Sequence, residues 1–213
     1  VLTALSVGYR HIDPAMISRN EEAVGKAIRD SGIPRDELFV TTKLWNDDQR
    51  SGNVEEAIRT SLEKLGTDYV DLYLVHWPVK ETYVSIWKKM EKVSRDGLTR
   101  AIGVSNYNPH HLDDLLKETD IIPVVNQIEC YPYFAQEDVV SYCQQKNIIP
   151  QAWAPLGAGK SDILSNPAIT AIASAHDKTP AQVALRWNRQ RGVIVIPKSV
   201  HKERLVENLS ITD

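Results

Sequence analysis

Four short apolar segments, each followed by a polar residue and then by a helical pattern, constrain the fold of this chain more than any other feature. Residues 9–12 precede Asp13, residues 38–42 precede Lys43, residues 69–75 precede His76, and residues 100–104 precede Ser105. A repeated order of strand, polar tip and helix is typical of a (β/α)8 barrel, whose site residues gather at the C-terminal ends of the strands. The sequence therefore predicts an α/β barrel with a site at that end.

Three further apolar segments, at residues 124–128, 148–152 and 193–196, bring the predicted strands to seven. Apolar residues that recur every three or four positions predict helices over Glu21–Ser31, Val54–Leu65, 84–95, 109–119, 139–146, 167–176 and 180–191. The last two helices follow one another with no strand between them, so one lies outside the simple repeat. No linker or low-complexity tract interrupts the pattern, which predicts a single domain over residues 1–213.

The predicted barrel is incomplete. The chain has 213 residues, whereas such barrels typically need about 250. Residues 1–7 have the pattern of a helix end that stops at Gly8, and seven parallel strands leave two open edges in a sheet that has to close. We therefore expect the sequence to lack the first strand of the barrel, and we expect a complete chain to be a monomer.

Charge and composition argue against several classes of function. With 25 Lys and Arg against 28 Asp and Glu, interspersed along the chain, the formal charge of −3 provides no basic surface for nucleic acid. No apolar run approaches the roughly 20 residues of a membrane span. The two cysteines, Cys130 and Cys143, have neither zinc-site spacing nor a disulfide framework, so we expect no metal and a reducing, cytoplasmic location. A small-molecule partner fits this composition best.

Five ordered motifs carry a resemblance to a known family. They are residues 8–25, 42–45, 74–78, 103–107 and 196–199, with the sequences GYRHIDPAMISRNEEAVG, TKLW, LVHWP, GVSNY and IPKS. Over nearly its whole length the chain resembles the aldo-keto reductases, in particular the group of diketogluconate reductases and prostaglandin F synthases. The resemblance implies a (β/α)8 TIM barrel that reduces small aldehydes or ketones with NADPH. It also implies that the family's N-terminal hairpin, first strand and C-terminal tail are missing from this sequence.

Asp13, Lys43 and His76 lie at the predicted tips of three successive strands, where barrel enzymes assemble their sites. A carboxylate keeps a neighbouring lysine charged, and the ammonium lowers the pKa of a hydroxyl that it contacts. His76 could orient a substrate carbonyl or donate a proton. The alternative is structural, with Asp13 and Lys43 forming a buried ion pair and His76 donating to a backbone carbonyl.

The chain departs from the family at two positions. The family has a tyrosine, its proton donor, where this chain has Ser18. A serine hydroxyl is far less acidic than a phenol and reaches less far, so His76 or a water would have to deliver the proton. Residues 18–21 also fit a capping box, in which Ser18 caps the helix and Glu21 reaches back to it. Pro14 replaces the family's usual threonine and removes a backbone N–H from the site.

Neutral polar residues at later strand ends suit a cofactor. Ser105 and Asn106 end one predicted strand and Gln127 ends the next, and such groups can bind a carboxamide. Trp153 follows the next strand and offers a flat face for a nicotinamide ring, although an ordinary core aromatic would fit the same pattern. The resemblance assigns these four positions, and Leu156, to cofactor binding.

Polar and charged residues after the last strand suit the ribose phosphate of NADP. They are Lys198, Ser199, Arg204, Glu207 and Asn208. Barrels commonly bind phosphate at this place, and two cations with a hydroxyl suit a dianion, which favours NADP over NAD. The alternative is a solvated basic loop that leads into a helix. No Gly-x-Gly-x-x-Gly motif follows any strand, which argues against a Rossmann fold.

Aromatic residues around the strand tips suit an apolar substrate pocket. They are Trp45, Tyr83, Trp87, Tyr107, Tyr131 and Tyr133. Trp45 and Trp77 closely follow Lys43 and His76, and we assign these two to the pocket. Two functions remain open: a carbonyl reductase, and a non-catalytic NADP-binding or scaffold protein that has lost its acid. Ser18 is the residue on which the choice depends.

Overall fold

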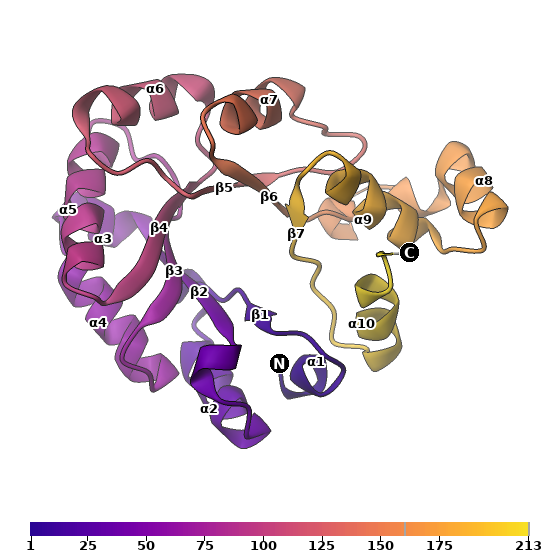
Figure 1. Cartoon of the computed structure of the whole chain (residues 1–213), viewed down its shortest axis with the longest axis horizontal. Coiled ribbons are helices and arrows are strands. Elements are labelled where there is room, and N and C mark those ends of the chain that lie inside the picture. The colour runs from indigo at the N-terminus through magenta and orange to yellow at the C-terminus, as the bar shows by residue number, and fades with distance from the viewer. Residues whose placement is uncertain (160, 213) are drawn as a thin grey trace. The chain divides into compact units, whose positions relative to one another are not determined.

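The computed structural model of the protein describes every residue except Lys160 and Asp213. It contains two compact units, Val1–Asn126 and Gln127–Asp213, and we describe each by itself. In both units strands alternate with helices, as the sequence predicts (Figure 1). No helix in the described part of the chain combines the length and the apolar composition needed to cross a membrane.

The sheet of the first unit contains four parallel strands in sequence order. They are β1 (His11–Ile12), β2 (Phe39–Leu44), β3 (Val70–Val75) and β4 (Thr99–Ser105). Lys43 lies beside Leu74 in this sheet, and Thr42 lies beside Tyr73. Because successive side chains of a strand point to opposite faces, Lys43 and Thr42 serve opposite faces of β2.

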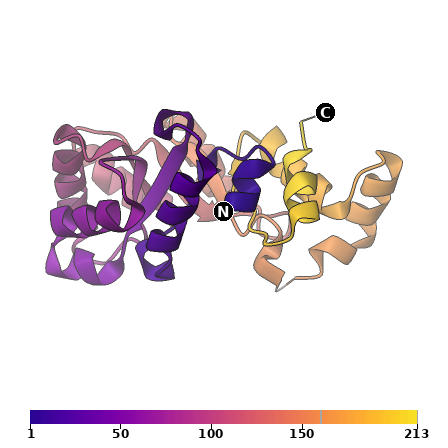
Figure 2. The same cartoon turned by 90° about the horizontal axis from the view of Figure 1, so that it is seen from below.

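Helices cover the outer side of these strands (Figure 1). They are α1 (Leu2–Ser6), α2 (Glu21–Ser31), α3 (Asn46–Ser51), α4 (Val54–Leu65), α5 (Tyr83–Arg95) and α6 (Pro109–Glu118), with short 3-10 turns η1 (Met16–Ser18) and η2 (Arg35–Glu37). In the turned view, the indigo and purple helices of this unit run alongside its strands (Figure 2). The predicted bounds of α2 and α4 are confirmed, whereas α3 and the 3-10 turns were not expected because they are too short to show a period.

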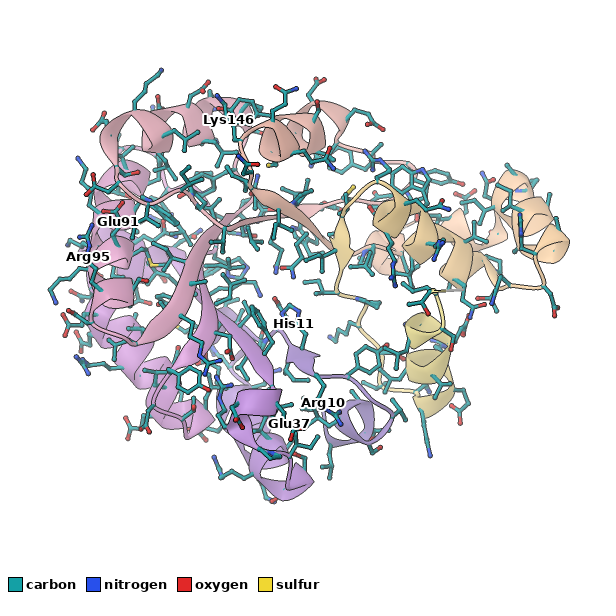
Figure 3. All side chains as sticks on the ribbon, viewed as in Figure 1. Arg10, His11, Glu37, Glu91, Arg95 and Lys146 are labelled. Atoms are coloured by element: carbon teal, nitrogen blue, oxygen red, sulfur yellow. The ribbon has the colours of Figure 1, made fainter. Side chains whose placement is uncertain are left out.

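Packing within this unit is close. A Cβ atom at Gly103 of β4 would lie 2.7 Å from Leu74 Cδ2 and 2.8 Å from Val125 O, so only glycine fits there. Glu91 of α5 accepts hydrogen bonds from the backbone N–H groups of Asp120, at 2.9 Å, and Ile121, at 2.8 Å. Glu91 is labelled beside Arg95 in Figure 3. These contacts hold neighbouring strands close together and fix α5 to the loop that precedes β5.

The second unit begins within β5 (Val125–Glu129), which starts in the first unit. Its strands β6 (Ile149–Trp153) and β7 (Ile194–Val195) pair in parallel. Its helices are α7 (Glu137–Gln145), α8 (Pro167–Ala175), α9 (Pro180–Gln190) and α10 (Lys202–Leu209), with 3-10 turns η3 (Gly157–Gly159) and η4 (Ile163–Ser165). The expected succession of two helices before the last strand is confirmed, since α8 leads to α9.

Two predicted strands are shorter than expected. The strand expected over residues 9–12 is only His11–Ile12, and that expected over 193–196 is only Ile194–Val195. After the last strand, the loop leads into a helix as expected, and that helix is α10. Strand ends depend on backbone pairing with a neighbour, which the apolar pattern of a single segment does not report.

Candidate active site

A buried ion pair lies at the C-terminal end of β1 and β2. Asp13 directly follows β1, and Lys43 lies near the end of β2. Lys43 Nζ donates hydrogen bonds to Asp13 Oδ1 and, at 3.0 Å, to Pro14 O. The side chains of Lys43 and Asp13 are only 6% and 10% exposed. The predicted pair is therefore present, and Pro14, expected only to remove a donor, supplies a carbonyl acceptor to it.

His76 follows β3 and lies beside this pair. Its backbone N–H donates to Leu44 O at 3.2 Å, which fixes it next to the end of β2. Its ring forms a T-shaped pair with that of Trp45, with centroids 5.1 Å apart and an interplanar angle of 79°. Burial, and then the Lys43 ammonium, lower the pKa of His76 to about 4. The imidazole is therefore neutral at pH 7.

The ring nitrogen Nδ1 of His76 is buried and has no hydrogen-bond partner among the described residues. In the structural alternative, His76 donates to a backbone carbonyl, but Nδ1 makes no such bond. A neutral imidazole has one N–H donor and one acceptor. His76 therefore retains hydrogen-bonding capacity that the described protein groups do not use.

The lowered pKa of His76 predicts an acid-sensitive stability. An unfolded chain binds a proton on this histidine below about pH 6.5, whereas the folded protein resists it until about pH 4. Stability should therefore be lost as the pH falls through this window. Urea unfolding measures the free energy of unfolding at pH 7 and at pH 4.5. Between these two pH values, this free energy should fall by about 2 kcal/mol less in His76→Gln than in the unsubstituted chain. His201→Gln, at an exposed position, is the control, and equal losses in all three proteins would contradict the assignment.

A second polar pair is formed by His11 and Thr41, which precede Asp13 and Lys43 by two residues, and Thr41 therefore shares a face of β2 with Lys43. The ring nitrogen Nε2 of His11 lies 3.0 Å from Thr41 Oγ1. His11 is labelled on β1 in Figure 3. The pKa of His11 is lowered, mainly by its burial. The sequence analysis missed this support for the site, although His11 lies within a quoted motif.

Asn106 links the ends of β3 and β4. Its backbone has a φ of 64°, in the left-handed region that asparagine tolerates better than most residues. Its Nδ2 donates to His76 O and to Ser105 Oγ, both at 3.0 Å. Ser105 is 1% exposed. Asn106 is therefore fixed to the backbone of the proposed catalytic histidine, and the Ser105 hydroxyl is bonded to Asn106.

The capping box predicted for residues 18–21 was wrong. Ser18 is the last residue of η1 and is exposed, while α2 has Asn20 as its N-cap and no side-chain cap bond. Glu21 points inward instead, and it accepts hydrogen bonds from Thr42 Oγ1 at 2.6 Å and Ser61 Oγ at 3.2 Å. The physical reason is packing, because Glu21 lies on the face of α2 that turns toward α4.

In the second unit, Gln127 lies inside β5 and Trp153 is the last residue of β6. Gln127 is 2% exposed, and its Nε2 donates to Gln151 Oε1 at 2.6 Å. Trp153 is half-buried. Leu156 packs against an apolar cluster that includes Ile163. These residues stay proposed cofactor contacts.

The residues after β7 divide into two groups. Lys198 and Arg204 are exposed, and neither forms an ion pair with any residue that the structure describes. Ser199 Oγ accepts from the backbone N–H of His201 at 3.1 Å. The Glu207 carboxylate accepts from the hydroxyl of Thr179, and Asn208 is buried. The exposed cations Lys198 and Arg204 are therefore available to an anion. The Glu207 side chain instead joins α10 to the start of α9.

The aromatic residues expected around the pocket are only partly suited to it. Trp45 contacts His76, and Trp77 is 41% exposed. Trp87 and Tyr107, which were considered as candidates but not assigned to the pocket, are 0% exposed and belong to the core. Tyr83 donates its hydroxyl hydrogen to Asp114. The apolar pattern that predicts a helix over residues 84–95 includes Trp87, and it agrees with the buried position of this residue in α5.

The chain is similar over its full length to known proteins. A family profile with the description Aldo/keto reductase family matches residues 1–213. The chain is 48% identical over 213 residues to glyoxal reductase of Bacillus subtilis, across 100% of this chain and 76% of the relative. It is 49% identical over 211 residues to 9,11-endoperoxide prostaglandin H2 reductase of Trypanosoma cruzi, across 99% and 75%. A methylglyoxal reductase of Yersinia pestis is 46% identical over 215 residues, across 100% and 77%.

Solved structures show the same similarity. An aldo-keto reductase from a Medee basin deep-sea metagenome library matches with a TM-score of 0.97 and 48% identity, across 100% of this chain and 79% of that one. An aldo-keto reductase of Bombyx mori in complex with NADP matches with a TM-score of 0.94 and 38% identity, across 100% and 76%.

Proposed function

The chain belongs to the aldo/keto reductase family, and on this premise we propose that it reduces small aldehydes and ketones, with NADPH as the reductant. The relatives named as glyoxal and methylglyoxal reductases support small dicarbonyls as substrates. The observation that carries the proposal is the buried Lys43–Asp13 pair beside the neutral His76. It lies at the ends of three successive strands, where barrel enzymes assemble their sites.

Each member of this trio has a distinct proposed role. A neutral His76 can donate an N–H hydrogen bond to a carbonyl oxygen. The Lys43 ammonium, held by Asp13 and Pro14 O, stabilises the negative charge that develops on that oxygen. Such fixed charges act strongly where water is largely excluded. When bound, NADPH supplies the hydride that reduces the carbonyl carbon.

The residues of the chain fit the cofactor. Ser105, at the end of β4, and Gln127, inside β5, are buried polar groups, and they suit a carboxamide. Trp153 offers a ring face, and Leu156 offers an apolar contact. Lys198, Ser199, Arg204, Glu207 and Asn208 are the proposed residues for the phosphate and ribose end. The related Bombyx mori structure contains NADP, which supports this cofactor.

The exposed cations predict a preference between cofactors. NADPH should quench the tryptophan fluorescence of the protein and bind roughly tenfold or more tightly than NADH at low salt, since charge-assisted hydrogen bonds to phosphate are strong. Replacing both Lys198 and Arg204 with alanine should remove the preference by weakening NADPH alone. Lys202→Ala, at an exposed position of α10, is the matched control, and Trp153→Phe reports which tryptophan is quenched. Equal affinity of the unsubstituted chain for NADPH and NADH would contradict the assignment of Lys198 and Arg204 to the ribose phosphate of NADP.

The catalytic proposal is tested by loss of NADPH absorbance with methylglyoxal or a nitrobenzaldehyde. We expect slow turnover that depends on the aldehyde, because Ser18 is exposed and no strong acid lies at its position. Binding of NADPH without any aldehyde-dependent oxidation would favour the second candidate, a non-catalytic NADP-binding or scaffold protein. The presence of Ser18, where the family has its proton-donating tyrosine, favours this second candidate.

A further inference from the structure

We propose that Glu21 is a positioning residue, which clamps the loop of residues 13–20 onto β2 and so holds Asp13 and Pro14 against Lys43. The proposal rests on the proposed reductase function for its effect on turnover, but the clamp itself stands on contacts alone. Glu21 acts through Thr42, the neighbour of Lys43 on β2, whose hydroxyl donates to its carboxylate.

Glu21 is a carboxylate in an unusual place. It is the first residue of α2, yet it is only 2% exposed, while its neighbour Glu22 is exposed. Acidic residues in the first turn of a helix normally face solvent, where they interact with the helix dipole at little cost. Burying a charged carboxylate is costly unless it is well hydrogen-bonded. The hydroxyls of Thr42 and Ser61 supply those bonds, at 2.6 Å and 3.2 Å.

The close packing of α2 on α4 directs Glu21 inward. A Cβ atom at Gly25 would lie 2.2 Å from Leu65 O, so the two helix backbones touch there. Glu21 precedes Gly25 by four residues, and Ser61 precedes Leu65 by four, so both pairs lie on the facing stripes of the two helices. The glycine contact therefore brings Glu21 within reach of Ser61.

The loop of residues 13–20 is consequently held to β2 at both ends. At its start, Lys43 binds Asp13 Oδ1 and Pro14 O. Immediately after its end, Glu21 binds Thr42, the residue next to Lys43 on the opposite face of the strand. Two anchors one residue apart on β2 fix this loop relative to the ammonium group. The loop also carries Ser18, so the clamp sets the position of that residue as well.

The test compares Glu21→Gln and Glu21→Ala with the unsubstituted chain, and it uses Glu22→Gln as the matched control on the exposed side of the same turn. Hydrogen exchange of residues 13–20 should become about tenfold faster in Glu21→Ala and stay unchanged in Glu22→Gln. The kcat for methylglyoxal should fall by roughly tenfold or more in Glu21→Ala, since small displacements of catalytic groups are costly. The affinity for NADPH should not change. Glu21→Gln, which keeps one acceptor oxygen, should lie between the two.

A second pair of variants keeps the test informative if Glu21→Ala folds poorly. Thr42→Val replaces the hydroxyl with a methyl group of similar size, whereas Thr42→Ser keeps the hydroxyl. We expect faster exchange of residues 13–20 and lower kcat in the valine variant. The serine variant should resemble the unsubstituted chain in both measurements. A lower melting temperature with unchanged exchange in residues 13–20 and unchanged kcat would overturn the clamp and leave a purely structural role. If the unsubstituted chain shows no turnover but exchange responds as expected, the clamp stands and the reductase proposal fails.

Discussion

Turnover of a small aldehyde should rise by roughly 10²-fold when Ser18 is replaced by tyrosine, because a positioned general acid typically contributes 10²–10⁴-fold. A phenol near the Lys43 ammonium can donate a proton at neutral pH, whereas serine is too weak an acid and too short. Ser18 is exposed at the end of η1, so a larger side chain displaces no core group. The affinity for NADPH should change little. Steady-state measurement of kcat with a nitrobenzaldehyde checks the result.

Ser18→Phe is the matched control, since phenylalanine has the size of tyrosine without its hydroxyl. It should give no gain. If tyrosine and phenylalanine behave alike, the hydroxyl is not used at this position. The proton donor would then lie elsewhere, and the binding-protein alternative would become the better account of this chain.

The second large effect concerns the buried ion pair. Lys43→Met should reduce the free energy of unfolding by about 3 kcal/mol, because it leaves the Asp13 carboxylate buried without its partner. Aldehyde reduction should fall to the background rate in the same variant. Urea unfolding at pH 7 measures the first effect, and NADPH oxidation measures the second.

The double variant Asp13→Asn with Lys43→Met separates stability from activity. Neither of these two positions then carries a buried charge, so most of the lost stability should return, while activity should not. Lys26→Met is the control, because it removes an exposed ion pair instead of a buried one. The side chains of Lys26 and Asp30 are 71% and 45% exposed. Exposed pairs contribute at most about 1 kcal/mol to the free energy of unfolding. A double variant as unstable as Lys43→Met would show that the cost comes from packing rather than from charge.

Helix positions could be predicted from the sequence because their signals are local. The bounds of α2 and α4 follow from apolar residues at helical spacing and from a glycine directly after each helix, and α9 begins with proline after its Thr179 cap. The order of strand and helix, and the polar residues at the strand tips, were also readable. Those tips include Asp13, Lys43 and His76, since parallel strands carry their C-terminal ends to one edge.

Other features could not be read from local pattern. Ser18 and Glu21 matched a capping box in sequence, yet the structure turns Glu21 toward Thr42 and Ser61. A glutamate at a helix start can satisfy either arrangement locally, and only the approach of α4 at Gly25 decides between them.

By itself, the sequence determined the family, the alternation of strands and helices, and the identity of the polar residues at the strand ends, because all of these are properties of short, contiguous segments. Only the tertiary structure decided which of those residues share contacts: Pro14 O as an acceptor for Lys43, the neutral state of His76, and the inward direction of Glu21. These depend on burial and on groups 21 or more positions apart in the chain, such as Glu21 and Thr42. A pattern within one segment carries no information about the depth at which its side chains are buried or about the partners they find there.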